Sequence, residues 1–296
     1  MTATASRLPT VRSSSVRPSP IGLVVEGFRE TLSRRRLIRY LIQADLKKKG
    51  SNTLLGNVWW VLDPLLQMLV YVVLVSIIFT RKQPDYALFV FAAILPWKWF
   101  TSSVGDAIAS VTSQERLIKQ LQFPKIVLPM AATFAGIANF GFGLIALGGL
   151  YLVFFRDRLT WYVLLVPLIA IVQLVFTIAL DLVLSAANVF VRDVSNISRH
   201  VLRLWFYLSP GLYSLSLVTE SSLGKEYPAI VTLLKLNPFA VLFEAYRAVI
   251  YGTATGGPPT SPDWIALGIL LAVSMVLVVL GAWFFKRLEP TFAKIV

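Results

Sequence analysis

Residues 161–191 read WYVLLVPLIAIVQLVFTIALDLVLSAANVFV, and this stretch decides the fold class. Its 31 residues include a single charged side chain, Asp181. A helix needs about 20 mainly apolar residues to cross about 30 Å of hydrocarbon, so this stretch can span a membrane and tilt within it. The whole chain agrees, because its 296 residues are 56% hydrophobic and only 15% charged. The sequence therefore predicts an all-α integral membrane protein.

Apolar stretches elsewhere bring the prediction to six transmembrane helices. The other regular spans are residues 57–80, 87–111, 126–155 and 264–285, and a shorter, less regular one covers 204–218 around Pro210-Gly211. Between the fifth and sixth spans, residues 229–251 are apolar but interrupted by Asn237-Pro238. Because proline lacks an amide donor, we predict two broken, re-entrant helices there, shielded from lipid by protein.

The first 50 residues are polar and basic rather than membrane-spanning. Residues 1–20 lack the apolar core of a secretory signal and are predicted to be a flexible cytoplasmic tail. In residues 21–50, apolar side chains recur every three or four positions among Arg and Lys, which predicts a basic amphipathic helix along the inner membrane surface. With six spans, the cytoplasmic segments hold 20 of the 28 Lys and Arg. Both termini are therefore expected to be cytoplasmic.

Several kinds of chemistry are excluded by what the sequence lacks. It has no Cys and a single histidine, His200, which excludes thiolate metal sites and argues against zinc sites and histidine-based triads. It has no Gly-x-x-x-x-Gly-Lys-Ser/Thr motif, so it cannot build a P-loop for ATP. We therefore expect no catalytic residue, metal or cofactor on this chain. The net charge of +13 is explained by basic residues at the inner membrane face, so no nucleic-acid partner is expected.

Four stretches, taken in order, carry a resemblance to a known family. They are residues 45–64 (DLKKKGSNTLLGNVWWVLDP), residues 94–100 (ILPWKWF), residues 115–129 (ERLIKQLQFPKIVLP), and Arg192-Asp193, Ser209-Pro210 and Asn237-Pro238 together with residues 285–293 (FKRLEPTFA). From about Arg39 onward, the chain resembles the permease subunit of ABC-2 type exporters. The branch it resembles moves O-antigens, teichoic acids, capsules and related lipid-linked glycans. On this resemblance, residues 51–296 form the ABC-2 transmembrane domain.

The resemblance implies a function and a set of partners. It implies a homodimer of six-span subunits in the bacterial plasma membrane, with a conduit between the protomers. Each subunit is expected to dock a separate P-loop ATPase subunit, which binds ATP and Mg²⁺. The implied substrate is a polysaccharide linked to polyprenyl diphosphate, moved from the cytoplasmic to the outer side. Membrane lipids are the remaining expected partners.

The segment between the second and third spans is the predicted contact with the ATPase. Residues 114–123 mix charged and apolar side chains and end at Phe123-Pro124, which suits a helix that lies across the membrane face and enters a groove of a partner. The alternative is a solvated loop. The predicted coupling residues are Glu115, Arg116, Leu117, Ile118, Lys119, Phe123, Pro124, Arg192 and Asp193.

Two further sets of residues are predicted to handle the substrate. Because several cations can jointly desolvate a diphosphate, the headgroup set comprises Arg34, Arg35, Arg36, Lys47, Lys48, Lys49, Leu55 and Gly56; binding of ordinary lipid headgroups is the alternative. Sugars have apolar CH faces, so an aromatic lining suits a conduit for glycans. The lining set comprises Trp59, Trp60, Tyr71, Trp97, Trp99 and Phe100; an interfacial belt or helix packing is the alternative.

Charges inside the spans need partners or water, because a lone charge there costs at least about 2.5–3.5 kcal/mol. Asp63 and Lys98 are therefore predicted to pair across the first two spans. Two other functions stay open at this point. One is an ABC-2 exporter for a drug or a simple lipid, and the other is a transferase acting on polyprenyl carriers. A purely structural anchor fits poorly, because broken helices are typical of a pathway or gate.

Overall fold

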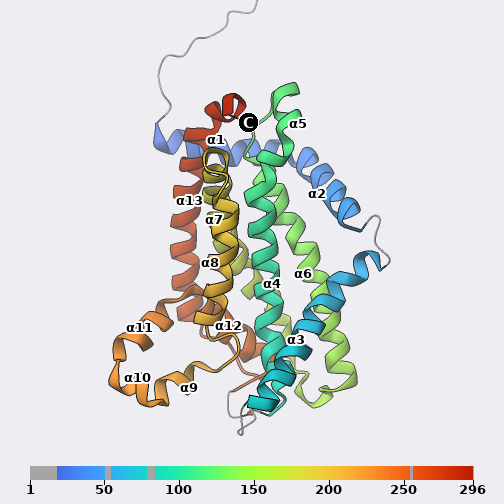
Figure 1. Cartoon of the computed structure of the whole chain (residues 1–296), viewed down its shortest axis with the longest axis vertical. Coiled ribbons are helices and arrows are strands. Elements are labelled where there is room, and N and C mark those ends of the chain that lie inside the picture. Colours follow the sequence, from blue (N-terminus) through green and yellow to red (C-terminus); the bar gives the residue numbers. More distant parts are fainter. Residues whose placement is uncertain (1–18, 51–54, 79–83, 254–255, 296) are drawn as a thin grey trace, which may run out of the picture.

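A computed structural model of the chain describes residues 19–50, 55–78, 84–253 and 256–295. In these ranges the chain is mostly helical and contains no strand (Figure 1). The predicted all-α class is therefore confirmed. The predicted tail, residues 1–20, lies outside the described residues up to position 18.

Four helices in the described ranges are long and apolar enough to cross a membrane. They are α4 (Tyr86–Ser110), α6 (Val127–Val153), α7 (Val166–Phe190, entered through a 3₁₀ turn at Trp161–Leu165) and α13 (Trp264–Ile295). A further apolar helix, α3 (Trp59–Ile78), follows a short turn at Gly56–Val58. Gly56 has a φ of 50°, a left-handed conformation that glycine adopts without a steric penalty.

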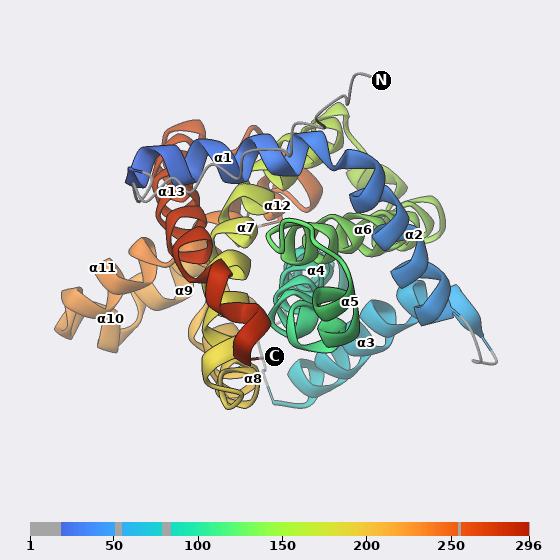
Figure 2. The same cartoon turned by 90° about the horizontal axis from the view of Figure 1, so that it is seen from above.

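Helix α4 is the centre of the bundle. Most of its residues are buried, and α3, α6, α7 and the shorter helix α8 all contact it. Helix α13 packs along α7, on the side away from α3 (Figure 2). Gly136 allows α6 to approach α4 closely, because a Cβ at this position would collide with the hydroxyl of Ser103 on α4. These contacts make α4 the scaffold on which the other helices are placed.

The segment predicted as the fifth span differs from the prediction. Helix α8 (Val194–Leu208) begins ten residues before Leu204, within what was expected to be a cytoplasmic loop. It ends at Leu208 because Ser209 is extended, as is usual for a residue that precedes proline, here Pro210. Two short helices follow, α9 (Leu215–Glu220) and α10 (Ser222–Glu226). The predicted continuous stretch 204–218 is therefore a helix end, a turn and a second helix.

The predicted break at Asn237-Pro238 is confirmed. Helices α11 (Pro228–Leu236) and α12 (Pro238–Ile250) meet there at a bend of 73°. The side chain of Asn237 caps α12 by accepting a hydrogen bond of 3.0 Å from the amide of Phe239. Helix α12 is buried in the bundle, whereas α9, α10 and α11 project from one end of it (Figure 1).

The basic N-terminal segment forms two helices rather than the single helix predicted for residues 21–50. Helix α1 (Pro20–Ser33) lies across the end of the bundle opposite α9–α11, and α2 (Arg35–Gly50) turns away from it at Arg34 (Figures 1 and 2). The two halves pack on different partners. Gly27 of α1 faces Lys286 of α13, while Ile38 of α2 packs against α6. The bend at Arg34 lets each half reach its own contact surface.

Candidate functional site

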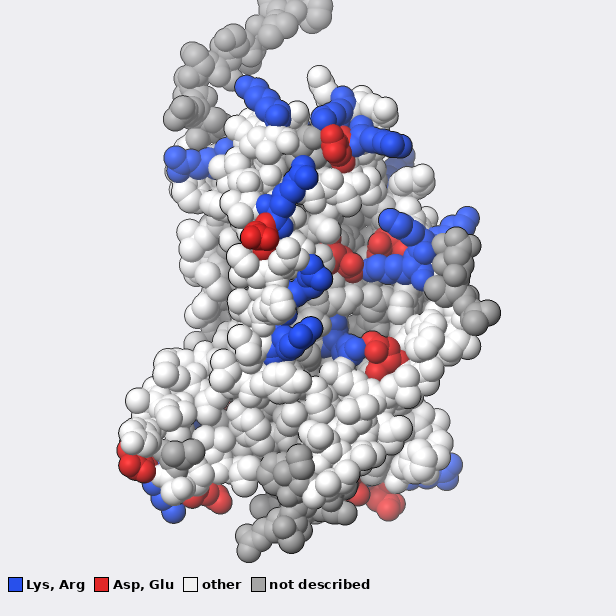
Figure 3. Space-filling view, in the orientation of Figure 1, with Lys and Arg blue, Asp and Glu red and all other residues white. Residues whose placement is uncertain are grey.

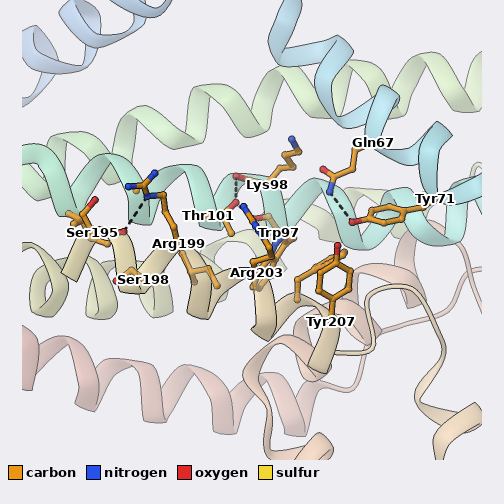
Figure 4. A pocket seen from close by; sticks show the side chains of 14 residues that line it. Gln67, Tyr71, Trp97, Lys98, Thr101, Ser195, Ser198, Arg199, Arg203 and Tyr207 are labelled. Atoms are coloured by element: carbon orange, nitrogen blue, oxygen red, sulfur yellow. Dashed lines mark hydrogen bonds between the residues drawn. The ribbon is translucent and has the colours of Figure 1, made fainter. Parts of the chain in front are cut away.

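A groove of about 500 Å³ opens between α3, α4 and α8 (Figure 4). Its wall combines basic, hydroxyl-bearing and aromatic side chains from three helices. They are Gln67 and Tyr71 of α3; Trp97, Lys98, Thr101, Gly105 and Ile108 of α4; and Ser195, Ser198, Arg199, Leu202, Arg203, Phe206 and Tyr207 of α8. The groove exists because only one face of α8 packs on the bundle, through Ser198, Leu202 and Phe206.

The charges in this groove are mainly positive. Arg199 and Arg203 extend from α8 toward α4 (Figure 4). Among the residues that the structure describes, Arg199 bonds only within its own helix, to the carbonyl of Ser195 (3.4 Å) and the side chain of Asn196. Arg203 makes no hydrogen bond or ion pair with any residue that the structure describes. Lys98 pairs with Asp63 of α3, which confirms the ion pair predicted between the first two spans.

The aromatic part of the wall joins the groove to the core. Trp97 is 6% exposed, and its ring lies 4.6 Å, centroid to centroid, from that of Phe239 in α12. Gln67 donates a hydrogen bond of 3.4 Å to the hydroxyl of Tyr71, and Tyr207 turns its own hydroxyl toward Tyr71 from α8 (Figure 4). The groove therefore has a rigid aromatic floor and a polar rim.

The residues predicted to line a conduit do not all lie in this groove. Tyr71 and Trp97 line it, whereas Trp60 packs edge-on against Phe142 beside a smaller cavity of about 150 Å³. Trp99 lines that smaller cavity and is largely buried, while Phe100 is fully buried in the core and Trp59 is 45% exposed. Lys98 lines both cavities, so the two adjoin at its side chain.

The predicted headgroup residues are distributed over two helices and a turn. Arg34, Arg35 and Arg36 are exposed around the bend between α1 and α2, and Leu55-Gly56 forms the turn into α3. Lys47 and Lys48 are exposed on the last turn of α2.

Lys49 is held in ion pairs, with its Nζ 2.9 Å from Asp45 and 2.6 Å from Asp106 of α4. Burial acts to lower the pKa of Lys49, but the two carboxylates outweigh it and leave the pKa above its ordinary value. Lys49 is therefore charged at neutral pH and ties the end of the basic segment to the central helix.

The predicted coupling residues lie at the end of the bundle that carries α1. Helix α5 (Glu115–Gln120) exposes Glu115 and Lys119, which form an ion pair of 2.6 Å that holds the pKa of Glu115 below its ordinary value. Ile118 is buried and Phe123 is partly buried, both in a cluster with Phe292 of α13. Arg192-Asp193 is exposed directly before α8.

A second cavity, of about 1400 Å³, lies between α1, α5 and α13 at the same end. The coupling residues Ile118, Lys119, Phe123 and Pro124 line it. Sequence reasoning missed the ionic cluster in its wall. Lys286 of α13 contacts Glu30 of α1 and Glu289 at 2.7 Å each, and Glu289 also accepts a hydrogen bond of 2.5 Å from the amide of Lys125. Burial raises the pKa of Glu30 above its ordinary value, despite the attraction of Lys286.

Comparisons with known proteins extend over nearly the whole chain. No protein-family model matches it. The chain is 34% identical over 269 residues to the O-antigen export system permease protein RfbA of Myxococcus xanthus, covering 90% of this chain and 97% of that protein. Two Klebsiella pneumoniae proteins, also named O-antigen export system permease protein RfbA, are 25% and 26% identical, each over 88% of this chain and 94% of their own length.

Several apolar spans, with a groove lined by basic side chains on one side, define the protein as a multi-pass membrane protein. More particularly, the chain belongs to the family of O-antigen export permeases, the membrane subunits of ABC-2 polysaccharide exporters. The family resemblance carried by the four sequence stretches is thus confirmed. The chain is accordingly a transport subunit and not an enzyme.

Proposed function

We propose that this chain moves a polysaccharide linked to polyprenyl diphosphate from the cytoplasmic to the outer side of the inner membrane. The observation that carries the proposal is the 34% identity to an O-antigen export permease over 97% of that protein's length. The basic groove supports the lipid-diphosphate part, because an anionic headgroup needs cations along its path. The aromatic floor supports the glycan part.

Six passes follow if α3 and α8 cross together with the four long helices. Both termini are then cytoplasmic, and the basic helices α1 and α2 lie along the inner membrane surface. The arrangement in space supports this topology, because α1, α5 and the end of α13 share one end of the bundle (Figure 1). The paired helices α11 and α12 are then a re-entrant element near the outer side.

A homodimer would cover the exposed side of α3 and α8. Helix α8 has 15 residues, about 22 Å at 1.5 Å per residue, and leaves Arg199 and Arg203 exposed beside membrane-spanning helices. Lipid is a costly environment for such charges, so this side needs water or protein. Apolar residues flank the arginines and offer a contact surface; they include Leu69, Val70 and Val73 on α3 and Val201, Leu204 and Leu208 on α8. Two protomers meeting here would enclose a wet conduit.

The ATPase subunit is proposed to dock at the end of the bundle that carries α1 and α5. Helix α5 offers exposed charged side chains to a soluble partner, and the cavity of about 1400 Å³ beside it offers a recess. That partner would bind ATP and Mg²⁺. Arg34 to Arg36 and Lys47 to Lys49 would meet the substrate headgroup near the same membrane face.

The direct test is to co-express the chain with its genomic neighbours and purify it from membranes. We expect a P-loop ATPase to co-purify in fixed stoichiometry, and its hydrolysis to rise when a polyprenyl-diphosphate oligosaccharide is added. The same ATPase purified without this chain is the control. If no ATPase associates, the energy source is missing and the exporter proposal fails. If a lipid without glycan stimulates equally well, the substrate is a simple lipid.

A further inference from the structure

If α8 crosses the membrane as proposed, three cations of the α3–α4–α8 groove lie at a depth where charge is rare in membrane proteins. Lys98 is the thirteenth of the 25 residues of α4, so it lies near the middle of a membrane-spanning helix. Arg203 lies beside it across the groove, and Arg199 lies one turn further along α8 (Figure 4). On the surface, Lys and Arg side chains follow one another along this face of the molecule (Figure 3).

Carboxylates within the described part of the chain neutralise one of these three cations and leave the other two unpaired. Asp63 pairs with Lys98, but no acidic side chain contacts Arg199 or Arg203. The two other carboxylates in the neighbouring spans are engaged elsewhere. Asp106 pairs with Lys49 (2.6 Å), and the buried Asp181 contacts the hydroxyl of Thr133 (2.5 Å). The groove therefore carries an excess of two positive charges.

The rest of the wall is also suited to an anion. Two guanidinium groups provide ten N–H donors, of which the contacts of Arg199 along its own helix use few. The hydroxyls of Tyr71 and Tyr207 face the same space (Figure 4). A groove of about 500 Å³ has room for a partly hydrated phosphate group.

We propose that Lys98, Arg199 and Arg203 form an anion site that receives the diphosphate of the exported glycolipid partway across the membrane. This inference rests on the proposed function, because it takes that glycolipid as the ligand. The site is separate from the basic residues of α1 and α2, which lie at the membrane face. Planar guanidinium groups bind phosphate oxygens in pairs, so the two arginines supply most of the binding free energy.

Asp63 acts in this proposal as an internal competitor. Its carboxylate occupies Lys98 in the absence of ligand, and an arriving phosphate displaces it. The exchange keeps Lys98 paired throughout, and the displaced carboxylate of Asp63, whose side chain is 58% exposed, is solvated by water. Removing the arginines of α8 should therefore weaken binding of the phosphate, whereas removing the competing charge of Asp63 should strengthen it.

The test measures equilibrium binding of a radiolabelled polyprenyl-diphosphate oligosaccharide to the permease–ATPase complex in phosphatidylcholine nanodiscs. The double variant Arg199→Gln with Arg203→Gln should weaken binding at least about tenfold, since charge-assisted hydrogen bonds are lost. The double variant Arg199→Lys with Arg203→Lys keeps the charge and should recover part of the affinity. Asp63→Asn should tighten binding about two- to fivefold. Arg156→Gln, which removes an exposed arginine outside the groove, should have no effect.

The outcomes separate this site from the proposed function. Unchanged binding in the arginine double variant, together with normal export by the wild type, overturns the site alone. No binding by the wild type overturns both. Competition by phosphatidylglycerol as strong as that of unlabelled glycolipid would assign the site to ordinary phospholipid headgroups and overturn the choice of ligand. Weaker binding by Asp63→Asn would overturn the role of competitor.

Discussion

The guanidinium of Arg247 closes the turn that follows α8. It is 2% exposed and donates hydrogen bonds to three carbonyls of that turn, those of Pro210 (2.6 Å), Gly211 (2.5 Å) and Tyr213 (3.2 Å). It also lies over the ring of Phe89, 3.7 Å from the centroid. Carbonyls in a buried turn have no partner in a helix or sheet and need donors, and one side chain supplies them here. Arg247 thereby holds the turn that follows α8, next to one wall of the groove.

Arg247→Leu should destabilise the protein by about 3 kcal/mol, because it leaves these carbonyls buried without donors. Unfolding by denaturant in detergent micelles, followed by tryptophan fluorescence, measures the change. Arg156→Leu, at an exposed arginine that bonds to the carbonyl of Leu152 four residues earlier, is the control and should cost less than about 0.5 kcal/mol. Equal stabilities of the two variants would contradict the role of Arg247.

Contacts between individual side chains were predictable only where a charge inside a membrane span needs a partner. Asp63 and Lys98 were paired from sequence because both lie in apolar spans of neighbouring helices. Lys49 was assigned to the headgroup of the substrate, since nothing in the local pattern shows that α2 ends beside Asp106. The contact of Lys286 with Glu30 joins residues 256 positions apart and depends on α1 crossing α13. Such contacts follow from packing, which a single sequence does not display.

At the scale of elements, α7 carries a buried polar face inside the membrane bundle. Gln173, Thr177, Asp181, Ser185 and Asn188 follow at helical spacing, and all are at most 4% exposed. The amides at its two ends bond to carbonyls of α4. Gln173 donates to Pro96 (2.8 Å) and Asn188 to Ile108 (3.0 Å), over about 22 Å of helix at 1.5 Å per residue. The two bonds fix the register of α7 on the central helix.

Gln173→Leu and Asn188→Leu should each destabilise the protein by about 1 kcal/mol, the usual size of a hydrogen bond between membrane helices. The double variant should lose the sum, because the two sites are too far apart to couple. Thermal denaturation in detergent gives all three values. A neutral or stabilising effect of both substitutions would show that packing alone sets the register.

Helix α5 is short and exposed, so its charges can be changed without disturbing the bundle. Reversing them with Glu115→Lys and Arg116→Glu should reduce ATPase coupling at least about fivefold while the protein reaches the membrane at normal levels. The matched control reverses Glu220 and Lys225 on α9 and α10, at the opposite end. Coupling is read as the substrate-stimulated part of ATP hydrolysis. Normal stimulation in the α5 variant would remove α5 from the contact with the ATPase.

The sequence predicted the long helices well and α8 poorly, for a physical reason. An apolar stretch of 20 or more residues is a local signal that needs no knowledge of neighbours. In α8, Arg199, His200 and Arg203 interrupt the apolar residues, so its first three turns resemble a cytoplasmic loop. The helix is stable because Leu202 and Phe206 pack on the core and its arginines face the groove. Helix α8, which supplies much of the groove wall, is thus the helix that local hydrophobicity predicts least well.

At the scale of the whole molecule, the proposed homodimer would cover the side formed by α3 and α8. The absence of cysteine makes this side accessible to experiment, since any introduced thiol is the only one on the chain. Val70 of α3 and Leu204 of α8 are 61% and 63% exposed here, and Val276 of α13 is 60% exposed on another side.

Single variants Val70→Cys, Leu204→Cys and Val276→Cys should differ in cross-linking. In native membranes, a bifunctional maleimide should convert Val70→Cys or Leu204→Cys to a species of twice the mass and leave Val276→Cys unchanged, as expected for a self-complementary two-fold interface. Gel electrophoresis reads the result. A dimer obtained only through Val276 would place the interface on α13 and leave the groove facing lipid or another partner.

The exposed arginines of α8 also affect how stable a newly made chain is before it assembles. A protomer that has entered the membrane alone presents Arg199 and Arg203 on an uncovered side, which is an unstable arrangement in hydrocarbon. An unassembled chain would thus expose charged side chains that a dimer covers, and membrane proteases could recognise them. Degradation of unassembled chains would then match the amount of permease in the membrane to the amount that assembles, without separate control of its synthesis.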